Sequence, residues 1–277
     1  NLPPGTFYAY ALKDEGGSYR YMSKTQLFAF SDSAVIVGRG TKPITLHAYA
    51  GKETNPPVKP AAETTRNTKA ADKRLKFSPN LSGDRQDLLD KFIMTFESKL
   101  KSFDTSKVHF STDTTFLPLS GYSWEMDSTK KIMKLDFPWQ ENMLYNLVLE
   151  KDFATDTLGY QLLKADTISF KAKGKKDYGK VTIRFRNLDL SQNPVLLFVQ
   201  NNEVKKSYPL YDVTFSEELF NPGDYSLRIL NDKNENGIWD PGVFFGKREQ
   251  PELVKPIQRT LNIKADRDNS FDIDINA

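Results

Sequence analysis

The sequence predicts an all-β protein made of tandem antiparallel β-sandwiches. Short runs rich in Val, Ile, Phe and Tyr recur along the chain, and clusters of Gly, Pro, Asn and Asp separate them. Several runs alternate apolar and polar residues, as half-buried strands do, and no long amphipathic helical pattern occurs. The 277 residues include 12% aromatic residues, which is enough apolar volume for two or three modest cores.

The first segment, residues 1–51, contains strand-like runs at 7–12, 27–30, 34–37 and 44–49. These strands are too few for a complete sandwich. We therefore expect the C-terminal part of a sandwich, which either has further strands upstream or borrows a strand edge from a neighbour.

Residues 52–74 are predicted to form a linker, because they contain three Pro and many Thr, Ala and Lys but no aromatic residue. Residues 52–76 hold seven Lys or Arg and three Asp or Glu, a local excess of +4. The net charge is +3, so the rest of the chain sums to −1 (3 − 4). A nucleic-acid reader carries its basic face on a folded module, so we expect no nucleic-acid partner.

Residues 75–174 are predicted to form a second sandwich, of the antiparallel kind with short, evenly spaced strands. An apolar pair at 88–89 opens this module, and residues 151–154 are expected to form one helical turn. The predicted strands are at 92–96, 108–110, 132–137, 144–149 and 167–170.

Residues 175–277 are predicted to form a third sandwich. Its first strand is the clearest, because Val181, Ile183 and Phe185 alternate with polar residues. Further predicted strands are at 194–199, 204–208, 211–215, 225–229, 261–263 and 271–275.

The first and third modules share an internal repeat. Residues 4–7 (Pro-Gly-Thr-Phe) align with residues 222–225 (Pro-Gly-Asp-Tyr), which places Asp14 on Asp232. With two residues inserted in the later copy, Gly17 aligns with Gly237 and Tyr19 with Trp239. The repeat predicts a tight turn, an alternating strand and a loop capped by its own Asp.

Three motifs carry a resemblance to known families. The Leu-x-Pro-Gly-x-Phe motif at residues 2–7 resembles prealbumin-like sandwiches of the carboxypeptidase-regulatory or collagen-adhesin B type. The middle module, through residues 144–147, 153–159 and 166–170, resembles bacterial Ig-like domains of the S-layer type. The order of the modules, with the pattern over residues 231–242 and then Gln-Pro-Glu, resembles the C-terminal part of Ig-like-domain envelope lipoproteins of Bacteroidetes.

This resemblance implies a place for the protein but no established activity. It implies a cell-envelope location, either periplasmic or surface-exposed, with outer-membrane tethering through a lipid anchor that this chain lacks. It also implies a further Ig-like domain upstream. The chain itself shows no apolar run of transmembrane length and no signal peptide. The expected partner is a protein or glycan at the envelope.

One loop has the ligand spacing of a calcium site. Ca²⁺ sites of the EF-hand type take oxygens from positions 1, 3, 5, 7 and 9 and a bidentate acid from position 12, with Gly at position 6. Gly237 fits position 6, but position 12 is Val243, so Glu249 or Glu252 would have to replace the missing acid. The alternative is a loop without an ion, capped by its own side chains. The five candidate ligands are Asp232, Asn234, Asn236, the Ile238 carbonyl and Asp240. We expect no other cofactor.

The sequence contains no recognisable catalytic constellation. Cysteine is absent, which excludes disulfides and thiolate chemistry, and the common zinc-protease, serine-hydrolase and phosphate-loop motifs are absent. His47 and His109 each lie in a strand-like run beside aromatic residues, which favours a packing or surface role.

The sequence therefore predicts a non-enzymatic modular envelope protein whose sandwiches act as spacer and binding modules. An alternative is a carbohydrate-binding accessory module, in which aromatic rings form a stacking platform. A third hypothesis is an enzyme with a cleft between the second and third modules. The candidate platform residues are Trp124, Trp139, Tyr145, Tyr160 and Trp239.

Overall fold

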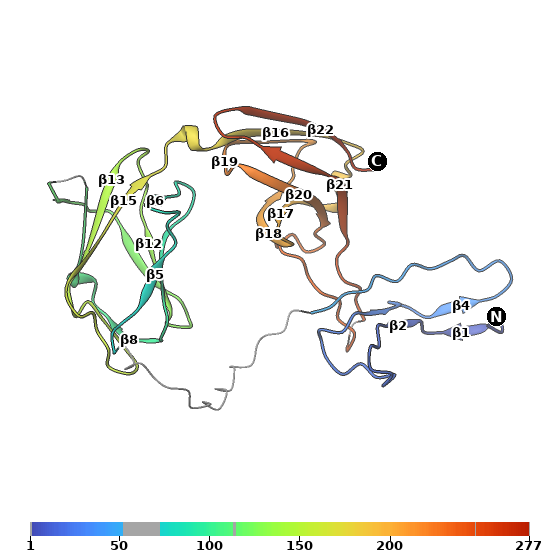
Figure 1. Ribbon diagram of the computed structural model, residues 1–277. Coiled ribbons are helices and arrows are strands. Elements are labelled where there is room, and N and C mark those ends of the chain that lie inside the picture. Colours follow the sequence, from blue (N-terminus) through green and yellow to red (C-terminus); the bar gives the residue numbers. More distant parts are fainter. Residues whose placement is uncertain (1, 52–72, 113–114, 247, 277) are drawn as a thin grey trace. The chain divides into compact units, whose positions relative to one another are not determined.

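The computed structural model describes residues 2–51, 73–112, 115–246 and 248–276 and is nearly all β, which confirms the predicted fold class (Figure 1). The chain divides into two compact units. One unit holds residues 64–178, and the other combines residues 1–63 with residues 179–277. The predicted module boundaries stay a prediction, and residues 52–72 of the predicted linker lie outside the described residues.

The unit around residues 75–178 is a sandwich of two main sheets. The five-stranded sheet has the order β10-β9-β13-β15-β6, and β6 joins β15 in parallel. Its strands are β10 (Leu117–Pro118), β9 (Val108–Thr112), β13 (Leu144–Leu149), β15 (Asp166–Ala172) and β6 (Arg85–Gln86). The four-stranded sheet comprises β11 (Ser123–Met126), β12 (Ile132–Asp136), β7 (Phe92–Phe96) and β5 (Phe77–Pro79), in that order. A separate pair joins β14 (Ala154–Asp156) to β8 (Leu100–Phe103).

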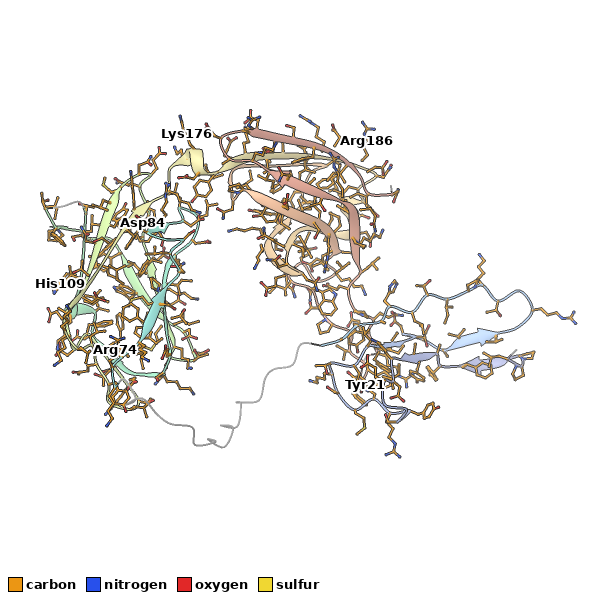
Figure 2. The ribbon with its side chains drawn as sticks, viewed as in Figure 1. Tyr21, Arg74, Asp84, His109, Lys176 and Arg186 are labelled. Carbon is orange, nitrogen blue, oxygen red and sulfur yellow. The ribbon has the colours of Figure 1, made fainter. Side chains whose placement is uncertain are left out.

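The core of this sandwich follows from the alternation of its strands. Phe92, Met94 and Phe96 of β7 are buried, whereas Thr95 between them is exposed. The aromatic ring of Phe92 stacks on Phe170 of the facing sheet, with ring centroids 5.1 Å apart. Figure 2 shows that side chains occupy the space between the sheets of this unit.

The second unit contains another sandwich, formed by residues 179–276. Its three-stranded sheet is β19 (Thr214–Phe220), β16 (Gly179–Arg186) and β22 (Asp268–Asp274), with β16 and β22 parallel. Its four-stranded sheet is β18 (Glu203–Pro209), β17 (Pro194–Gln200), β20 (Gly223–Asn231) and β21 (Val254–Ile263). β17 lies inside its sheet, and all its residues except Gln200 are buried, as expected for a strand covered on both faces.

The N-terminal segment contributes two short ladders to the same unit. β1 (Gly5–Phe7) pairs with β4 (Val35–Val37), and β2 (Tyr10–Leu12) pairs with β3 (Phe28–Phe30). The expected strand at 44–49 is reduced to a single bridge between Phe28 and Tyr49. Pro43 directly precedes this run and Ile44 within it is exposed, and the run forms no continuous ladder.

Helical structure in the described residues is limited to three short 3₁₀ turns, η1 (Thr105–Lys107), η2 (Lys175–Asp177) and η3 (Leu190–Gln192). The helical turn expected at 151–154 is not formed. Lys151 and Asp152 make a plain turn, Phe153 and Ala154 are buried in the core, and β14 begins at Ala154. No helix in the described part of the chain is long and apolar enough to cross a membrane.

Candidate functional site

The loop that follows β20 is organised around one buried carboxylate. Asp232 is 1% exposed. Its Oδ2 accepts the N–H of Gly237 at 2.6 Å, and its Oδ1 accepts the N–H of Asn236 at 3.3 Å. Gly237 has φ +74°, a backbone conformation that glycine adopts without strain. Asp232 therefore holds the loop closed by capping its own backbone.

The polar side chains of the loop bond to one another. Asp240 Oδ2 accepts the side-chain amides of Asn234 at 2.7 Å and Asn236 at 2.8 Å. Asn236 Oδ1 in turn accepts the N–H of Ile238 at 2.7 Å. Four of the five predicted ligand positions thus share one hydrogen-bonded network through their side chains.

A second buried carboxylate, Glu252, clamps the loop from outside it. It is 6% exposed, and its two oxygens accept the N–H groups of Lys233 at 2.7 Å and Asp240 at 2.9 Å. The indole N–H of Trp239 donates to the Glu252 carbonyl at 3.0 Å. Of the two acids that the sequence offered as replacements, Glu252 reaches the loop, whereas Glu249 pairs through its backbone with Val243.

The side chains of the loop could coordinate a hard cation only after the two asparagine amides are reoriented. Asn234 and Asn236 present amide nitrogens to Asp240, and a cation requires their oxygens there. Rotating both amides by half a turn would direct their oxygens toward Asp240. It would also break the bonds that Asn234 Oδ1 and Asn236 Oδ1 accept from the N–H groups of Asn236 and Ile238. Within the described residues, no group of three or more His, Asp or Glu side chains is placed to hold a metal ion. The calcium assignment stays a prediction.

The same loop joins the N-terminal segment to the C-terminal sandwich. Trp239 packs against the cluster of Val195, Leu197, Val199 and Leu230 on one side. It also packs against the cluster of Phe28, Phe30 and Tyr49 on the other. Phe244 adds an edge-to-face contact with Phe28, at a centroid distance of 5.0 Å. The sequence repeat gave no sign of this junction.

A small hollow lies at this junction. Its volume is about 310 Å³, and Tyr49, Trp239 and Glu252 line it together with residues 46–48 and 251–254. Gly242 borders Tyr49 so closely that a Cβ there would lie 2.7 Å from the ring. The backbone of His47 lies nearby and donates to Gln250 Oε1 at 3.4 Å.

The N-terminal copy of the loop has the same plan with fewer bonds. Asp14 accepts the N–H groups of Gly16 and Tyr19, and Gly17 has φ +66°. The Tyr19 N–H is the main cause that lowers the pKa of Asp14. This loop is exposed.

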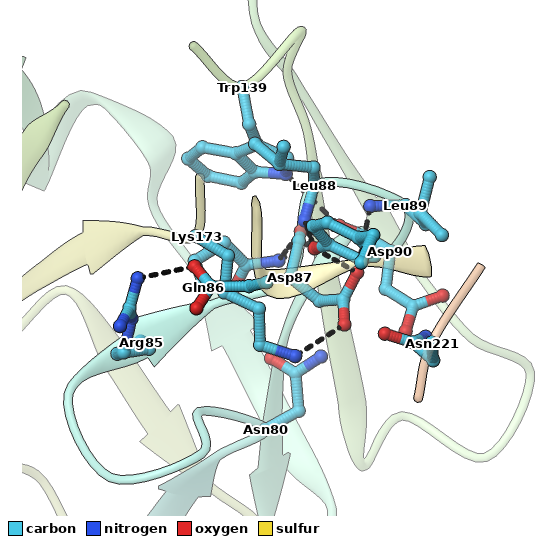
Figure 3. Close-up of polar contacts among 12 residues, drawn as sticks. Asn80, Arg85, Gln86, Asp87, Leu88, Leu89, Asp90, Trp139, Lys173 and Asn221 are labelled. Atoms are coloured by element: carbon cyan, nitrogen blue, oxygen red, sulfur yellow. Dashed lines mark hydrogen bonds and ion pairs between the residues drawn. The ribbon is translucent and has the colours of Figure 1, made fainter. Parts of the chain in front are cut away.

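The middle sandwich carries a polar network that the sequence did not reveal (Figure 3). Asp87 Oδ1 accepts the Tyr178 hydroxyl at 2.8 Å and the N–H of Leu89 at 2.9 Å, and its Oδ2 pairs with the Lys173 ammonium at 2.8 Å. The Tyr178 oxygen also accepts the N–H of Leu88 at 2.7 Å. These residues come from a turn, from the end of β15 and from the end of η2, so only the fold brings them together.

The electrostatics of this network favour a structural role. Burial raises the pKa of Tyr178 far above its ordinary value, and the neighbouring Asp87 raises it further. The hydrogen bond from the Leu88 N–H lowers this pKa but does not outweigh burial. For Asp87, burial opposes ionisation, but the bonds from Lys173, Leu89 and Tyr178 outweigh it and lower its pKa. A phenol that keeps its proton this firmly is a poor general base.

The predicted aromatic platform is not assembled from the tryptophans. Trp139 packs into the core of the middle sandwich beside Phe110, Tyr145 and Phe170, and Trp124 packs against Phe103. Trp239 packs in the other unit. His109 is exposed on the middle sandwich, where its Nε2 lies 2.7 Å from Glu150 Oε1.

The middle sandwich also has a larger hollow of about 740 Å³. Its wall is apolar at Leu75, Phe77 and Ile168, and charged residues of both signs surround it. Lys76 and Glu97 in this rim lie 4.0 Å apart. The mixed charge favours no particular class of ligand.

Comparisons with known proteins do not assign this chain to a family. No family model matches it, and a comparison with curated proteins finds no match. Among solved structures, native alpha-2-macroglobulin from Escherichia coli spanning domains MG0-NIE-MG1 has 13% identity over 71% of this chain and 91% of that chain, with TM-score 0.31. Fibronectin(III)-like modules of Clostridium thermocellum CbhA have 10% identity over 69% and 94%, with TM-score 0.21. BcpA, the major pilin subunit of Bacillus cereus, has 9% identity over 90% and 84%, with TM-score 0.25. Similarities this distant carry no argument about function, and the β-sandwich fold of this chain stands on its own strand pairing.

Proposed function

We propose that this chain is a non-enzymatic modular protein of the cell envelope, whose β-sandwiches act as spacer and binding modules. The observation that supports this most directly is how the buried acids are used. Asp232 and Asp156 accept backbone N–H groups of their own loops, and Glu252 accepts those of the Asp232 loop. The half-buried Asp87 is neutralised by Lys173. Acids committed in this way stabilise the fold and are not free for proton transfer.

The test combines binding with turnover. The full chain is titrated calorimetrically against envelope glycans and used in pull-downs from envelope extracts, and a broad hydrolase panel is run in parallel. We expect binding without turnover. Reproducible turnover that a single substitution of Asp or Glu abolishes would overturn the proposal.

The second candidate is a carbohydrate-binding accessory module. Its support comes from single exposed rings, because Tyr19, Tyr211 and Phe245 are 91%, 90% and 78% exposed, whereas the tryptophans are packed. Polysaccharide titrations followed by tyrosine and tryptophan fluorescence test this candidate. If Tyr211→Ala and Tyr19→Ala leave any observed shift unchanged, the exposed rings are not the binding platform.

We also propose that the Asp232 loop binds Ca²⁺ with modest affinity. The support is the convergence of Asn234, Asn236 and Asp240, together with the Glu252 carboxylate close by. Ca²⁺ should raise the melting temperature of the wild type and a chelator should lower it again, because an ion bound only by the folded state stabilises it. Asp240→Asn should remove this response. An identical melt with Ca²⁺ and with chelator would leave only the capping role.

A further inference from the structure

The two copies of the internal repeat have the same strand register. In the first copy, two short antiparallel ladders join residues 5–7 to 35–37 and residues 10–12 to 28–30, from Gly5 opposite Val37 to Leu12 opposite Phe28. In the second copy, residues 223–230 pair with residues 254–263 end to end. The first strand advances seven positions in both copies (5 to 12; 223 to 230), and the second retreats nine (37 to 28; 263 to 254).

The hydrogen bond that closes each ladder is also the same. Lys13 donates its N–H to the Leu27 carbonyl at 2.9 Å, and Asn231 donates its N–H to the Leu253 carbonyl at 2.9 Å. Both bonds lie directly before the capping Asp of the loop. The two hairpins can therefore be compared residue by residue.

In the second copy, the outer edge of the first strand is occupied. β17 pairs with β20 along its length, from Pro194 opposite Asn231 to Val199 opposite Ser226. Asn231 directs its N–H toward β21. Because successive residues of a strand direct their backbone groups to opposite sides, the residues on either side of Asn231 direct theirs toward β17. Asp232 shows this directly, since its N–H donates to the Asn193 carbonyl at 3.2 Å.

In the first copy, the equivalent edge has no strand beside it in the described residues, where β1-β4 and β2-β3 are two-stranded. By the register above, the backbone groups of Tyr8, Tyr10 and Leu12 face away from β3 and β4. An open sheet edge is a template for pairing with another chain.

The apolar face behind this edge is also incompletely covered. In the second copy the inward side chains are 5%, 1% and 2% exposed; these are Tyr225, Leu227 and Ile229. Their counterparts Phe7 and Ala9 are half-buried, and Ala11 is exposed. Two small alanines here leave room that large apolar side chains of a neighbouring strand would fill.

We propose that residues 5–12 accept an antiparallel β-strand from a polypeptide segment outside residues 1–277, and that this strand has the chemistry of β17. Such a strand is uncharged and carries large aliphatic or aromatic residues on both faces, as in Pro-Val-Leu-Leu-Phe-Val-Gln of β17. Main-chain bonds to the open edge supply affinity, and the side chains opposite Ala9 and Ala11 supply specificity. A second copy of this chain fits less well, because its own residues 5–12 offer only the same small alanines.

This inference deepens the proposed binding role by naming a partner class. The probe is a synthetic peptide with the sequence of residues 194–200 and lysines at both ends for solubility. It is titrated into the full chain, with a scrambled peptide as control. We expect the β17 peptide to bind and the scrambled peptide to bind at least about tenfold more weakly, since register and alternation determine the fit.

Two matched variants locate the site. Ala11 and Thr6 are both exposed, so Ala11→Glu and Thr6→Glu should both leave the fold intact, as checked by circular dichroism. Ala11→Glu places a charge on the face to be covered and should weaken the peptide about tenfold or more. Thr6→Glu should not change binding, because its counterpart in the occupied copy is the exposed Asp224.

Hydrogen exchange gives an independent readout. Bound peptide should slow exchange at Tyr8, Tyr10 and Leu12 and leave the already paired neighbours unchanged. Equal binding of the scrambled peptide, no protection at these three amides, or a concentration-dependent dimer that excludes the peptide would each overturn the proposal. The non-enzymatic role would survive such a failure, since it depends on the turnover screen.

Discussion

At the scale of single residues, this protein uses aspartate to close its loops. Asp232 and Asp156 are almost fully buried and accept two backbone N–H groups each. Asp127 does the same at the surface, where the Thr129 hydroxyl and nearby N–H groups lower its pKa to about 2. Each of these acids replaces main-chain partners that the loop cannot provide.

The first prediction concerns the Asp232 cap. Asp232→Ala removes the acceptor of the Gly237 N–H and leaves the Asn236 N–H bonded to Asn234 Oδ1 alone. We expect a loss of about 2 kcal/mol in the free energy of unfolding, measured by urea denaturation. Asp14→Ala in the exposed copy is the matched control and should cost about 0.5 kcal/mol or less. Equal losses in the two variants would contradict the importance given to burial.

The second prediction concerns Asp87 and pH. Its folded-state pKa is below the ordinary 3.8, so its ionised form contributes stability that is fully present above that value. This contribution is lost as the pH falls through the lowered folded-state pKa. Asp87→Asn should therefore destabilise residues 64–178 by about 3 kcal/mol at pH 7, and the difference from wild type should shrink toward pH 2. A difference that is constant over this range would show that the charge of Asp87 is not what matters.

At the scale of elements, the loop after β20 connects the two N-terminal ladders to the C-terminal sandwich. Trp239 belongs to the apolar clusters on both of its sides, and Glu252 fixes the backbone around it. The N-terminal ladders are too short to be stable alone. Their place in the unit therefore depends on this contact.

The third prediction follows from that dependence. Trp239→Ala should lower the free energy of unfolding by about 2 kcal/mol, which is less than the loss expected for a fully buried tryptophan. It should also speed hydrogen exchange at the Phe28–Tyr49 bridge. Ile238→Ala is the control, because the neighbouring Ile238 side chain is 68% exposed. Unchanged exchange at Phe28 in the Trp239 variant would mean that other contacts hold the N-terminal segment.

At the scale of the whole molecule, the two units have separate cores. Residues 64–178 enclose the cluster around Phe92, Leu147 and Phe153, and the sandwich of residues 179–276 encloses the cluster around Ile183, Phe198 and Leu261. Each core has its own pair of sheets. Mutational effects should therefore stay within a unit.

The fourth prediction tests this separation. Phe153 is fully buried in the middle core, so Phe153→Ala should destabilise residues 64–178 by about 3–5 kcal/mol. Hydrogen exchange in β16 and β22 of the other unit should stay as in wild type. Faster exchange in both units would show that they unfold together.

Periodicity in the sequence predicted most strands but not their partners. The runs at 92–96 and 144–149 match β7 and β13, because an alternating or continuous apolar pattern depends only on residues close together in the chain. β5, β6, β8, β10, β11 and β14 were missed, since each has at most four residues, too few for a recurring pattern. The parallel pairing of β16 with β22 joins residues about ninety positions apart and leaves no local signal.

What the sequence determined by itself was the all-β class, the repeated hairpin and an Asp-capped loop in each copy, because turn residues and side-chain alternation act over a few positions. Only the tertiary structure decided that Glu252 clamps the loop, that Trp239 joins the N-terminal segment to the C-terminal sandwich, and that Asp87, Lys173 and Tyr178 form one network. It also decided that β17 covers the edge of one copy of the hairpin, whereas no strand of the described residues covers the equivalent edge of the other. Such contacts depend on which distant strands lie side by side, and burial selects those partners after the chain has folded.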